Sequence, residues 1–438
     1  MSTRGVVVDV RRNIYRLGTG VGALTAAMNA LKANGTYDTF IHRHHDAMMN
    51  PSLLPGETTM ATGRNSAHRG PAFGPWHRYY IRDLELQLQS VAPGITLPYW
   101  DWAADAALPS PKAAPLWSAA YIGSDGVAPD YLTPDGPFKN WIALLMQPGT
   151  MTLVPRPTPG IKRRLGSDPS GYATLPGALE VTDSLTEPLY DVSPWNEQPV
   201  SFRNRLEGFL VRPSEPAFEP RMHNRVHTWV GGDMMPGTSP NDPVFFLHHC
   251  NVDRLWAQWQ AKHPTAPYAP ASGGPPGHNL NQAMRDIGAA GITPASTLNH
   301  HGMGYMYDTE NQLTADECGA SAAINVARGA TAQLMACYTN TGTVNWLRGS
   351  ATQVNLAPAP LGSPSQFSSW ASSWLSPTAY ATTSQNQCAP GQMANFLFAI
   401  TPPLTIPQGT YVLLGELVLA NTGVPLQAPT YRQLVNVQ

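Results

Sequence analysis

Residues 221–256 read RMHNRVHTWVGGDMMPGTSPNDPVFFLHHCNVDRLW and hold four of the 13 histidines in the chain. His223 and His227 are four residues apart, and on a helix this spacing brings both imidazoles to one face. His248 and His249 follow in an apolar stretch at the start of a second predicted helix. Such a concentration of imidazoles indicates either a hydrogen-bonded core or a metal site.

Asp253 lies one helical turn after His249. A carboxylate at that spacing accepts a hydrogen bond from an imidazole N–H that faces away from a metal, which fixes the tautomer and orientation of the ring. We therefore expect Asp253 to orient His249. His248 falls on the side of Val252 and Leu255, which favours a buried structural position beside the site.

A second set of histidines lies in the first half of the chain. The candidate ligands there are His42, His44 and His45 in FIHRHHDAMM (40–49), and His68 and His77 in SAHRGPAFGPWHRYY (66–80). The two sets supply three imidazoles each, without the Glu-x-x-His pairs of a di-iron bundle. Neutral nitrogen ligands suit copper, zinc, iron or nickel, and a carboxylate-free set of three plus three favours copper.

The length of 438 residues favours two domains, and a hydrophobic content of 42% is enough for a sizeable core. A net charge of −2 with no basic stripe argues against nucleic-acid binding and against adhesion to anionic membranes. No apolar run is long enough to span a membrane. Because the N-terminal MSTRGVVVDVRRN does not read as a secretory signal, we expect a cytoplasmic protein or one exported without its own signal peptide.

The hydrophobic pattern predicts a mainly α fold for residues 1–310, a loop-rich four-helix bundle with inward-pointing metal ligands. The predicted helices are 22–35, 39–49 with Asp38 as N-cap, one opened by Pro75, 222–230 and 246–260, with a short helical segment at 202–210. Residues 103–200 are rich in turn formers, and Val6–Val10 predicts a short strand.

From residue 311 to 438 the amino-acid composition and the hydrophobic pattern change, which predicts a second, β-rich domain. Ser, Thr, Ala and Gly dominate its first part, and its end alternates turn residues with β-branched and apolar runs. The four cysteines of the chain form no CxxC pair. Three of them, Cys318, Cys337 and Cys388, allow one disulfide with one thiol left over.

Five segments together resemble the two copper-binding regions of the tyrosinase family. They are YDTFIHRHHDAMM (37–49), SAHRGPAFGPWHRYYIRDLE (66–85), LPYWDWA (97–103), MHNRVHTWVGG (222–232) and SPNDPVFFLHHCNVDRLWAQW (239–259). Their order and spacing are kept across the first part of the chain, which makes the match far more specific than any single motif.

The resemblance implies a type 3 centre, in which two copper ions with three histidines each use O2 as co-substrate. By position it implies His44, His68 and His77 for the first copper, and His223, His227 and His249 for the second. Fungal and plant relatives carry a cysteine, cross-linked to the second histidine, where this chain has Ser66. We therefore expect no thioether, and the pattern is similar to that of bacterial members.

The resemblance further implies ortho-hydroxylation of monophenols and oxidation of o-diphenols to o-quinones, the precursors of melanin. Glu207 and Asn224 match the residues that hold a proton-accepting water in the family. The alternative for both is a solvated side chain. Thr228 and the loop 231–239 are expected to line the entrance.

Two other functions remain open from the sequence. One is a catechol oxidase or o-aminophenol oxidase with little monophenolase activity, which Glu207 and Asn224 together argue against. The other is a haemocyanin-like O2 carrier, which the bacterial-type motif and the modest length disfavour.

The expected partners are a small phenolic substrate and a separate copper-delivery protein, as in some bacterial relatives. In plant and fungal relatives a C-terminal domain covers the site, and residues 311–438 have a suitable length for such a shield. Candidate plugs are Phe367, Trp370, Trp374 and Tyr380, which serve equally well as core aromatics.

If residues 311–438 shield the active site, removal of the chain after Asp308 should raise the turnover of phenols, because the blocking side chain leaves with it. Steady-state rates of the full and the truncated chain, both loaded with copper and both checked for folding by circular dichroism, test this. An unchanged rate in a folded truncated chain would contradict a shielding role.

Overall fold

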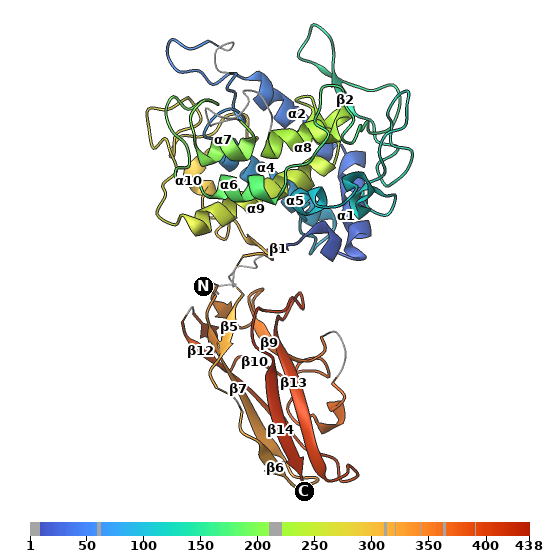
Figure 1. Cartoon of the computed structure of the whole chain (residues 1–438), viewed down its shortest axis with the longest axis vertical. Helices are drawn as coiled ribbons and strands as arrows, with labels where there is room; N and C mark the ends of the chain where they lie inside the picture. The colour runs from blue at the N-terminus through green and yellow to red at the C-terminus, as the bar shows by residue number, and fades with distance from the viewer. Residues whose placement is uncertain are drawn as a thin grey trace. The chain divides into compact units, whose positions relative to one another are not determined.

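The computed structural model describes residues 9–58, 63–209, 221–310, 313–319, 321–342, 344–361, 365–389 and 391–438. The chain divides into two compact units, Val10–Asp308 and Thr309–Gln438, and Asp9 belongs with the second (Figure 1). The first unit is mainly helical and the second is built of strands, so the predicted fold class is confirmed. No helix among the described residues is long and apolar enough to cross a membrane.

Nine α-helices of the described residues form the first unit. The longer ones are α1 (Gly20–Ala33), α2 (Thr36–Met49), α4 (Phe73–Val91), α8 (Met222–Val230) and α9 (Val244–Lys262). The shorter ones are α5 (Trp102–Ala106), α6 (Ala178–Leu185), α7 (Phe202–Glu207) and α10 (Pro294–Thr297). Two short strand pairs accompany them, β1 (Asp9–Arg11) with β4 (Tyr305–Tyr307), and β2 (Leu144–Met146) with β3 (Leu153–Pro155). The predicted strand Val6–Val10 lies largely outside the described residues.

The start of α2 differs from the prediction that Asp38 is its N-cap. The helix begins at Thr36, and Gly35 occupies the N-cap position with a φ of 81°. In this left-handed conformation, which glycine adopts without a steric cost, the chain turns at once from α1 into α2. Asp38 therefore lies in the first turn of α2, where it forms an ion pair with Lys32 of α1.

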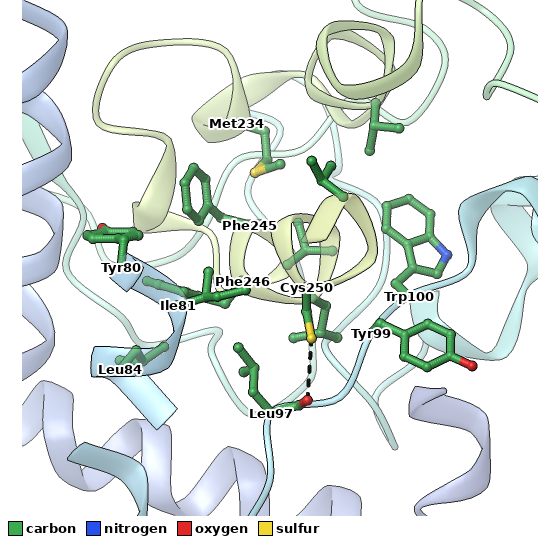
Figure 2. Close-up of a cluster of buried hydrophobic side chains, with 14 of the residues drawn as sticks. Tyr80, Ile81, Leu84, Leu97, Tyr99, Trp100, Met234, Phe245, Phe246 and Cys250 are labelled. Carbon is green, nitrogen blue, oxygen red and sulfur yellow. Dashed lines mark hydrogen bonds between the residues drawn. The ribbon is translucent and has the colours of Figure 1, made fainter. Parts of the chain in front are cut away.

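An apolar cluster packs side chains of α4 against side chains of α9 (Figure 2). Tyr80 of α4 stacks on Phe246 of α9 with ring centroids 5.6 Å apart. Cys250, fully buried on α9, donates a hydrogen bond to the carbonyl oxygen of Leu97 at 3.4 Å. Phe245, a member of this cluster, also contacts the histidines, since its ring stacks on that of His249 with centroids 4.1 Å apart. The position of α9 is thus fixed by packing on both sides.

A buried charge network holds α9 to α4 and to the β1–β4 pair. Asp253 accepts hydrogen bonds from Arg78 at 2.5 Å and from Arg11 at 3.2 Å. The hydroxyls of Tyr305 and Tyr307 each donate to the same carboxylate at 2.5 Å. Burial alone would raise the pKa of Asp253, but the two guanidinium groups and the two hydroxyls hold it below its ordinary value.

The second unit consists of mainly antiparallel sheets that pack through aromatic side chains. Its strands are β5 (Ala315–Glu317), β6 (Ile324–Val326), β7 (Ala332–Asn340), β8 (Trp346–Leu347), β9 (Val354–Pro358), β10 (Ala381–Thr382), β11 (Gln387–Cys388), β12 (Met393–Ile400), β13 (Gly409–Leu419) and β14 (Tyr431–Val437). The larger sheets have the orders β10-β9-β13-β14-β6, in which the β14–β6 pair is parallel, and β12-β7-β5. Phe398 joins them, with Tyr380 stacked on it at 4.9 Å and Tyr431 at 6.0 Å.

The contacts of the second unit account for several residues singled out from the sequence. Cys318 and Cys337 form a disulfide, and Cys388 is a buried free thiol. Trp370 and Tyr380 are both 1% exposed, and their ring contacts are to Phe367, Tyr411, Trp374 and Phe398 of the same unit. Their contacts are those of core aromatics, the alternative to a plug.

The charge network predicts a large loss of stability for Asp253→Ala, because Arg78 would remain buried without a carboxylate partner, whereas Arg11 would keep only its ion pair with Glu85. We expect the free energy of unfolding to fall by about 3–5 kcal/mol, measured by urea denaturation of the metal-free protein at pH 7. Since the folded-state pKa of Asp253 is lowered, its contribution is present above the unfolded-state pKa of about 4 and is lost as the pH falls below it.

The matched control is Arg16→Ala, which removes an ion pair with Asp308 in which the arginine side chain is 70% exposed. That change should cost less than about 1 kcal/mol. Equal effects of the two substitutions would contradict a structural role for the buried network.

Candidate metal centre

The structure brings together the three histidines predicted in the first half of the chain. His44 lies on α2, His77 on α4, and His68 on the loop before α4. The ring centroids of His44 and His68 are 5.2 Å apart, and those of His68 and His77 are 4.7 Å apart. One nitrogen from each ring lies within 4.8 Å of the other two, which is a spacing that one metal ion can span.

The two neighbours of His44 lie outside this group. His42 is exposed, and His45 is buried on the adjacent part of α2. Of the three histidines in FIHRHHDAMM, it is thus His44 that faces His68 and His77, as the i, i+4 face with Phe40 suggests.

The second group contains four histidines from α8 and α9. The Nε2 atom of His249 lies 3.2 Å from that of His223 and 3.4 Å from that of His227. His248 is fully buried and stacks on His223 with centroids 5.1 Å apart. The two groups are adjacent, because His77 stacks on His249 with centroids 4.3 Å apart and an interplanar angle of 16°.

Four of the rings have their Nδ1 atom against an oxygen. The contacts are His44 with Gly237 O at 2.7 Å, His77 with Phe73 O at 2.9 Å, His227 with Met234 O at 2.7 Å, and His223 with Asn224 Oδ1 at 2.9 Å. An acceptor at Nδ1 assigns the proton to that nitrogen and leaves the Nε2 lone pair for a metal. Within the described residues, the buried Nε2 atoms of His44 and His77 have no hydrogen-bond partner.

Burial keeps these imidazoles uncharged. It lowers the pKa of His44 to about 3 and that of His227 to about 4, and it lowers the pKa values of His68, His77 and His223 well below the ordinary value. Neutral imidazole is the form that binds a metal. Unpartnered lone pairs in a buried space are otherwise unfavourable, so the donor set fits a pair of copper ions.

The expectation that Asp253 orients His249 is wrong. The carboxylate of Asp253 is held by Arg11, Arg78 and the two tyrosines of β4, and the Nδ1 atom of His249 has no hydrogen-bond partner among the described residues. Helical spacing places the two residues one turn apart, but the cations and hydroxyls compete more strongly for the carboxylate. Phe245, stacked on the ring of His249, takes over the orienting contact.

The loop that carries His68 is fixed by hydrogen bonds from outside the two copper-binding regions. The hydroxyl of Ser66 donates to Asp286 at 2.5 Å, and the amide of Asn50 donates to the same carboxylate at 2.8 Å. Ser66, at the position where other relatives have a cysteine, therefore holds this loop through a hydrogen bond to Asp286. The Nδ1 atom of His68 has no hydrogen-bond partner among the described residues, so its position depends on this loop.

His278 holds the same loop from the other side. Its Nδ1 atom accepts from the backbone N–H of Ala72 at 3.0 Å, and its Nε2 atom faces the carbonyl oxygen of Asn65 at 3.1 Å. Both ring nitrogens of His278 therefore have a hydrogen-bond partner, so this buried histidine has a structural role that needs no metal. The sequence offered no signal for either contact, because Asp286 and His278 lie more than 200 residues away.

A cavity of about 670 Å³ opens above the two histidine groups. Its lining includes His44, His68, His223 and His227, the charged residues Arg69, Glu197 and Glu207, and Met48, Asn65, Gln198, Gly208, Phe209, Asn224, Thr228, Met235, Pro236 and Ser239. Thr228 and part of the loop 231–239 are thus in its wall, as expected. Its volume falls in the range of sites for small organic ligands.

Glu207 is not a solvated side chain, since it is 1% exposed. Its Oε1 atom accepts from the backbone N–H of Arg69 at 2.6 Å, and its Oε2 atom accepts from Arg203 at 3.1 Å. Burial raises the pKa of Glu207 to about 7, against the lowering effect of Arg203. The carboxyl group is therefore able to gain or lose a proton near neutral pH.

Gly208, directly after Glu207, lies where the end of α7 meets the start of α8. Its φ is 107°, and a Cβ atom there would lie 1.8 Å from the carbonyl oxygen of Arg221 and 3.0 Å from the Cβ atom of Asn224. Only glycine lets the end of α7 approach the start of α8 this closely. Asn224, through its contact with His223, also orients that ring, a role that the sequence did not suggest.

Comparison with known proteins assigns this chain to a family. The model of the common central domain of tyrosinase matches residues 34–262. A tyrosinase of Streptomyces antibioticus is 39% identical over 279 residues, which cover 63% of this chain and 90% of that protein. A protein named grixazone synthase, from Streptomyces griseus, is 35% identical over 298 residues, which cover 64% of this chain and 93% of that protein.

Among solved structures, a tyrosinase from Burkholderia thailandensis aligns over 98% of this chain and 94% of that chain, with 15% identity and a TM-score of 0.44. Because this identity and this TM-score are low, the family assignment rests on the family model and on the relatives found by sequence.

The Ser66–Asp286 contact leads to a prediction about metal retention. In Asp286→Ala the loop of His68 loses the hydrogen bond from Ser66, and Asn50 at the end of α2 loses its hydrogen bond to the same carboxylate. The affinity of the first histidine group for copper should therefore fall by about 10–100-fold while that of the second is kept. Chelator competition, followed by metal analysis, measures both affinities. Asp135→Ala is the matched control, since Asp135 accepts from Ser124 at 2.6 Å and does not line the cavity. Parallel loss of both coppers in Asp286→Ala would contradict a local role.

Proposed function

The chain belongs to the tyrosinase family of copper oxidases, and from this premise we propose that it hydroxylates monophenols at the ortho position and oxidises o-diphenols to o-quinones, using O2. One observation carries the proposal. Two adjacent groups of neutral imidazoles form the floor of a cavity that also contains a buried carboxylate, Glu207. The catalytic unit would be Val10–Asp308, which holds every residue of this cavity.

For the metal ligands, we propose His44, His68 and His77 for one copper and His223, His227 and His249 for the other. The convergence of nitrogens within each group and the anchored Nδ1 atoms support this set. His249 is favoured over His248 because its Nε2 atom lies within 3.4 Å of both partners from α8. When bound, a copper pair supplies the activation of O2 and the two-electron oxidation.

The protein would contribute proton transfer, orientation and exclusion of water. Glu207 has one further lone pair on each carboxylate oxygen beside its contacts to Arg69 and Arg203, and a water held there by Glu207 and Asn224 can take the phenol proton. Phe245, packed on His249, keeps bulk water from the floor of the site. A phenol entering above His223 and His227 would meet both the base and the metal ligands.

Two alternatives differ from this proposal in their use of the cavity. A catechol or o-aminophenol oxidase has little need for a base at the phenol, and the placement of Glu207 in the cavity wall favours hydroxylation. An O2 carrier must keep phenols out, whereas a cavity of about 670 Å³ is large enough to admit them. Because the metal-facing nitrogens lie deep in the protein, delivery of copper by a separate helper protein fits this site.

Steady-state rates on one copper-replete preparation test the function. L-Tyrosine, L-dopa and 3-amino-4-hydroxybenzoate are compared, and the proposal predicts oxidation of tyrosine after a lag. Oxidation of dopa or the aminophenol without tyrosine would instead support the first alternative, and reversible O2 binding without turnover would support the second.

Replacement of Glu207 by glutamine tests the proposed base. We expect kcat for monophenols to fall by about 100-fold, because the amide cannot accept the proton, while kcat for o-diphenols changes by less than about threefold. Glu180→Gln is the control, because Glu180 also pairs with an arginine, Arg225 of α8, but does not line the cavity. An equal fall in both activities of Glu207→Gln would refute a base that acts on monophenols alone.

A further inference from the structure

Arg69 and Glu197 form an ion pair in the wall of the cavity, with Nη1 and Oε2 2.8 Å apart. We propose that this pair determines specificity by the charge of the ring substituent, and that it favours a substituent with both a carboxylate and an ammonium group over one with either charge alone. The proposal rests on the proposed function and names the class of phenol that the same site prefers.

The backbone of Arg69 is the first observation. Its φ is 56°, in the left-handed region that a residue with a Cβ atom rarely adopts. Its N–H is required there, since it donates to Glu207. Glycine would give the same hydrogen bond without strain, so the side chain at this position needs its own reason, and strained residues cluster at functional sites.

The ion pair of Arg69 and Glu197 is also partly open to solvent. The side chain of Arg69 is 43% exposed and that of Glu197 is 30% exposed, although both line the cavity. An ion pair this open contributes little to stability, so the fold does not depend on it. The guanidinium group also lies 5.4 Å from the ring centroid of Phe209, which limits its orientations.

The charges of Arg69 and Glu197, and the number of N–H donors on Arg69, determine which substituents this pair can bind. The guanidinium group has five N–H donors, and one contact to Glu197 leaves others for a substrate carboxylate. Glu197 has a second carboxylate oxygen, which can accept a hydrogen bond from an ammonium group. A zwitterionic substituent therefore satisfies both partners, whereas a substituent with one charge is attracted by one partner and repelled by the other.

The test uses the full chain loaded with copper and four catechols whose substituents differ in charge: L-dopa, dopamine, 3-(3,4-dihydroxyphenyl)propionate and uncharged 4-methylcatechol. Each KM is divided by the KM for 4-methylcatechol. In the wild type, the ratio should be lowest for L-dopa.

Arg69→Gly keeps the N–H that binds Glu207 and removes the side chain that carries the guanidinium group. We expect the KM ratio to rise about tenfold for L-dopa and the propionate and to fall for dopamine. Glu197→Gln should give the opposite signs for the two singly charged compounds, and Arg69→Lys should restore part of the wild-type pattern. Arg16→Ala, which changes an exposed arginine away from the cavity, is the control and should leave all ratios unchanged.

Ratios that stay the same in Arg69→Gly and Glu197→Gln, or that move in the same direction for dopamine and the propionate, would overturn the proposal. Dissociation constants of the same compounds for the copper-free protein provide a second readout. If the copper-loaded wild type oxidises none of the catechols, the proposed function fails, and the binding ratios still decide whether the pair selects by charge.

Discussion

Uncharged imidazoles must be held in a buried space with their lone pairs directed at one another, and the rest of this structure depends on that constraint. Desolvation by burial keeps the rings neutral, as the lowered pKa values of His44 and His227 show. Hydrogen bonds from Nδ1 to fixed oxygens then choose the tautomer. Without a metal, the facing nitrogens would remain a local source of instability, so binding of copper should stabilise the folded chain.

The groups around the histidines perform different tasks, although they lie close together. The apolar cluster of α4 and α9 fixes the position of the His249 ring, because Phe245 of this cluster stacks on it. The charge network around Asp253 fixes the same helix one turn later, and Asp286 fixes the loop of His68. Glu207 and the pair of Arg69 and Glu197 face the cavity, where protons and substituents of a substrate would be met.

The sequence predicted local features well and long-range contacts poorly. The helix Met222–Val230 has the predicted bounds, because an amphipathic pattern and a terminal glycine pair define both ends. His44, His68 and His77 could be grouped only through the family resemblance, since their spacing in the chain is not that of one element. Asp253 was assigned to His249 from helical spacing, but Arg11 and Tyr307, far away in sequence, determine its contacts. The hydrogen bonds of Asp286 and His278 had no local signal at all.

The most direct test of the central claim is the copper content of the full chain, measured by metal analysis together with the Cu(II) electron paramagnetic resonance signal of the same oxidised sample. Two histidine groups as close as the stacked rings of His77 and His249 imply two copper ions per chain whose spins are coupled, and therefore almost no signal. One copper per chain, or two coppers with a full signal from isolated ions, would contradict the paired centre.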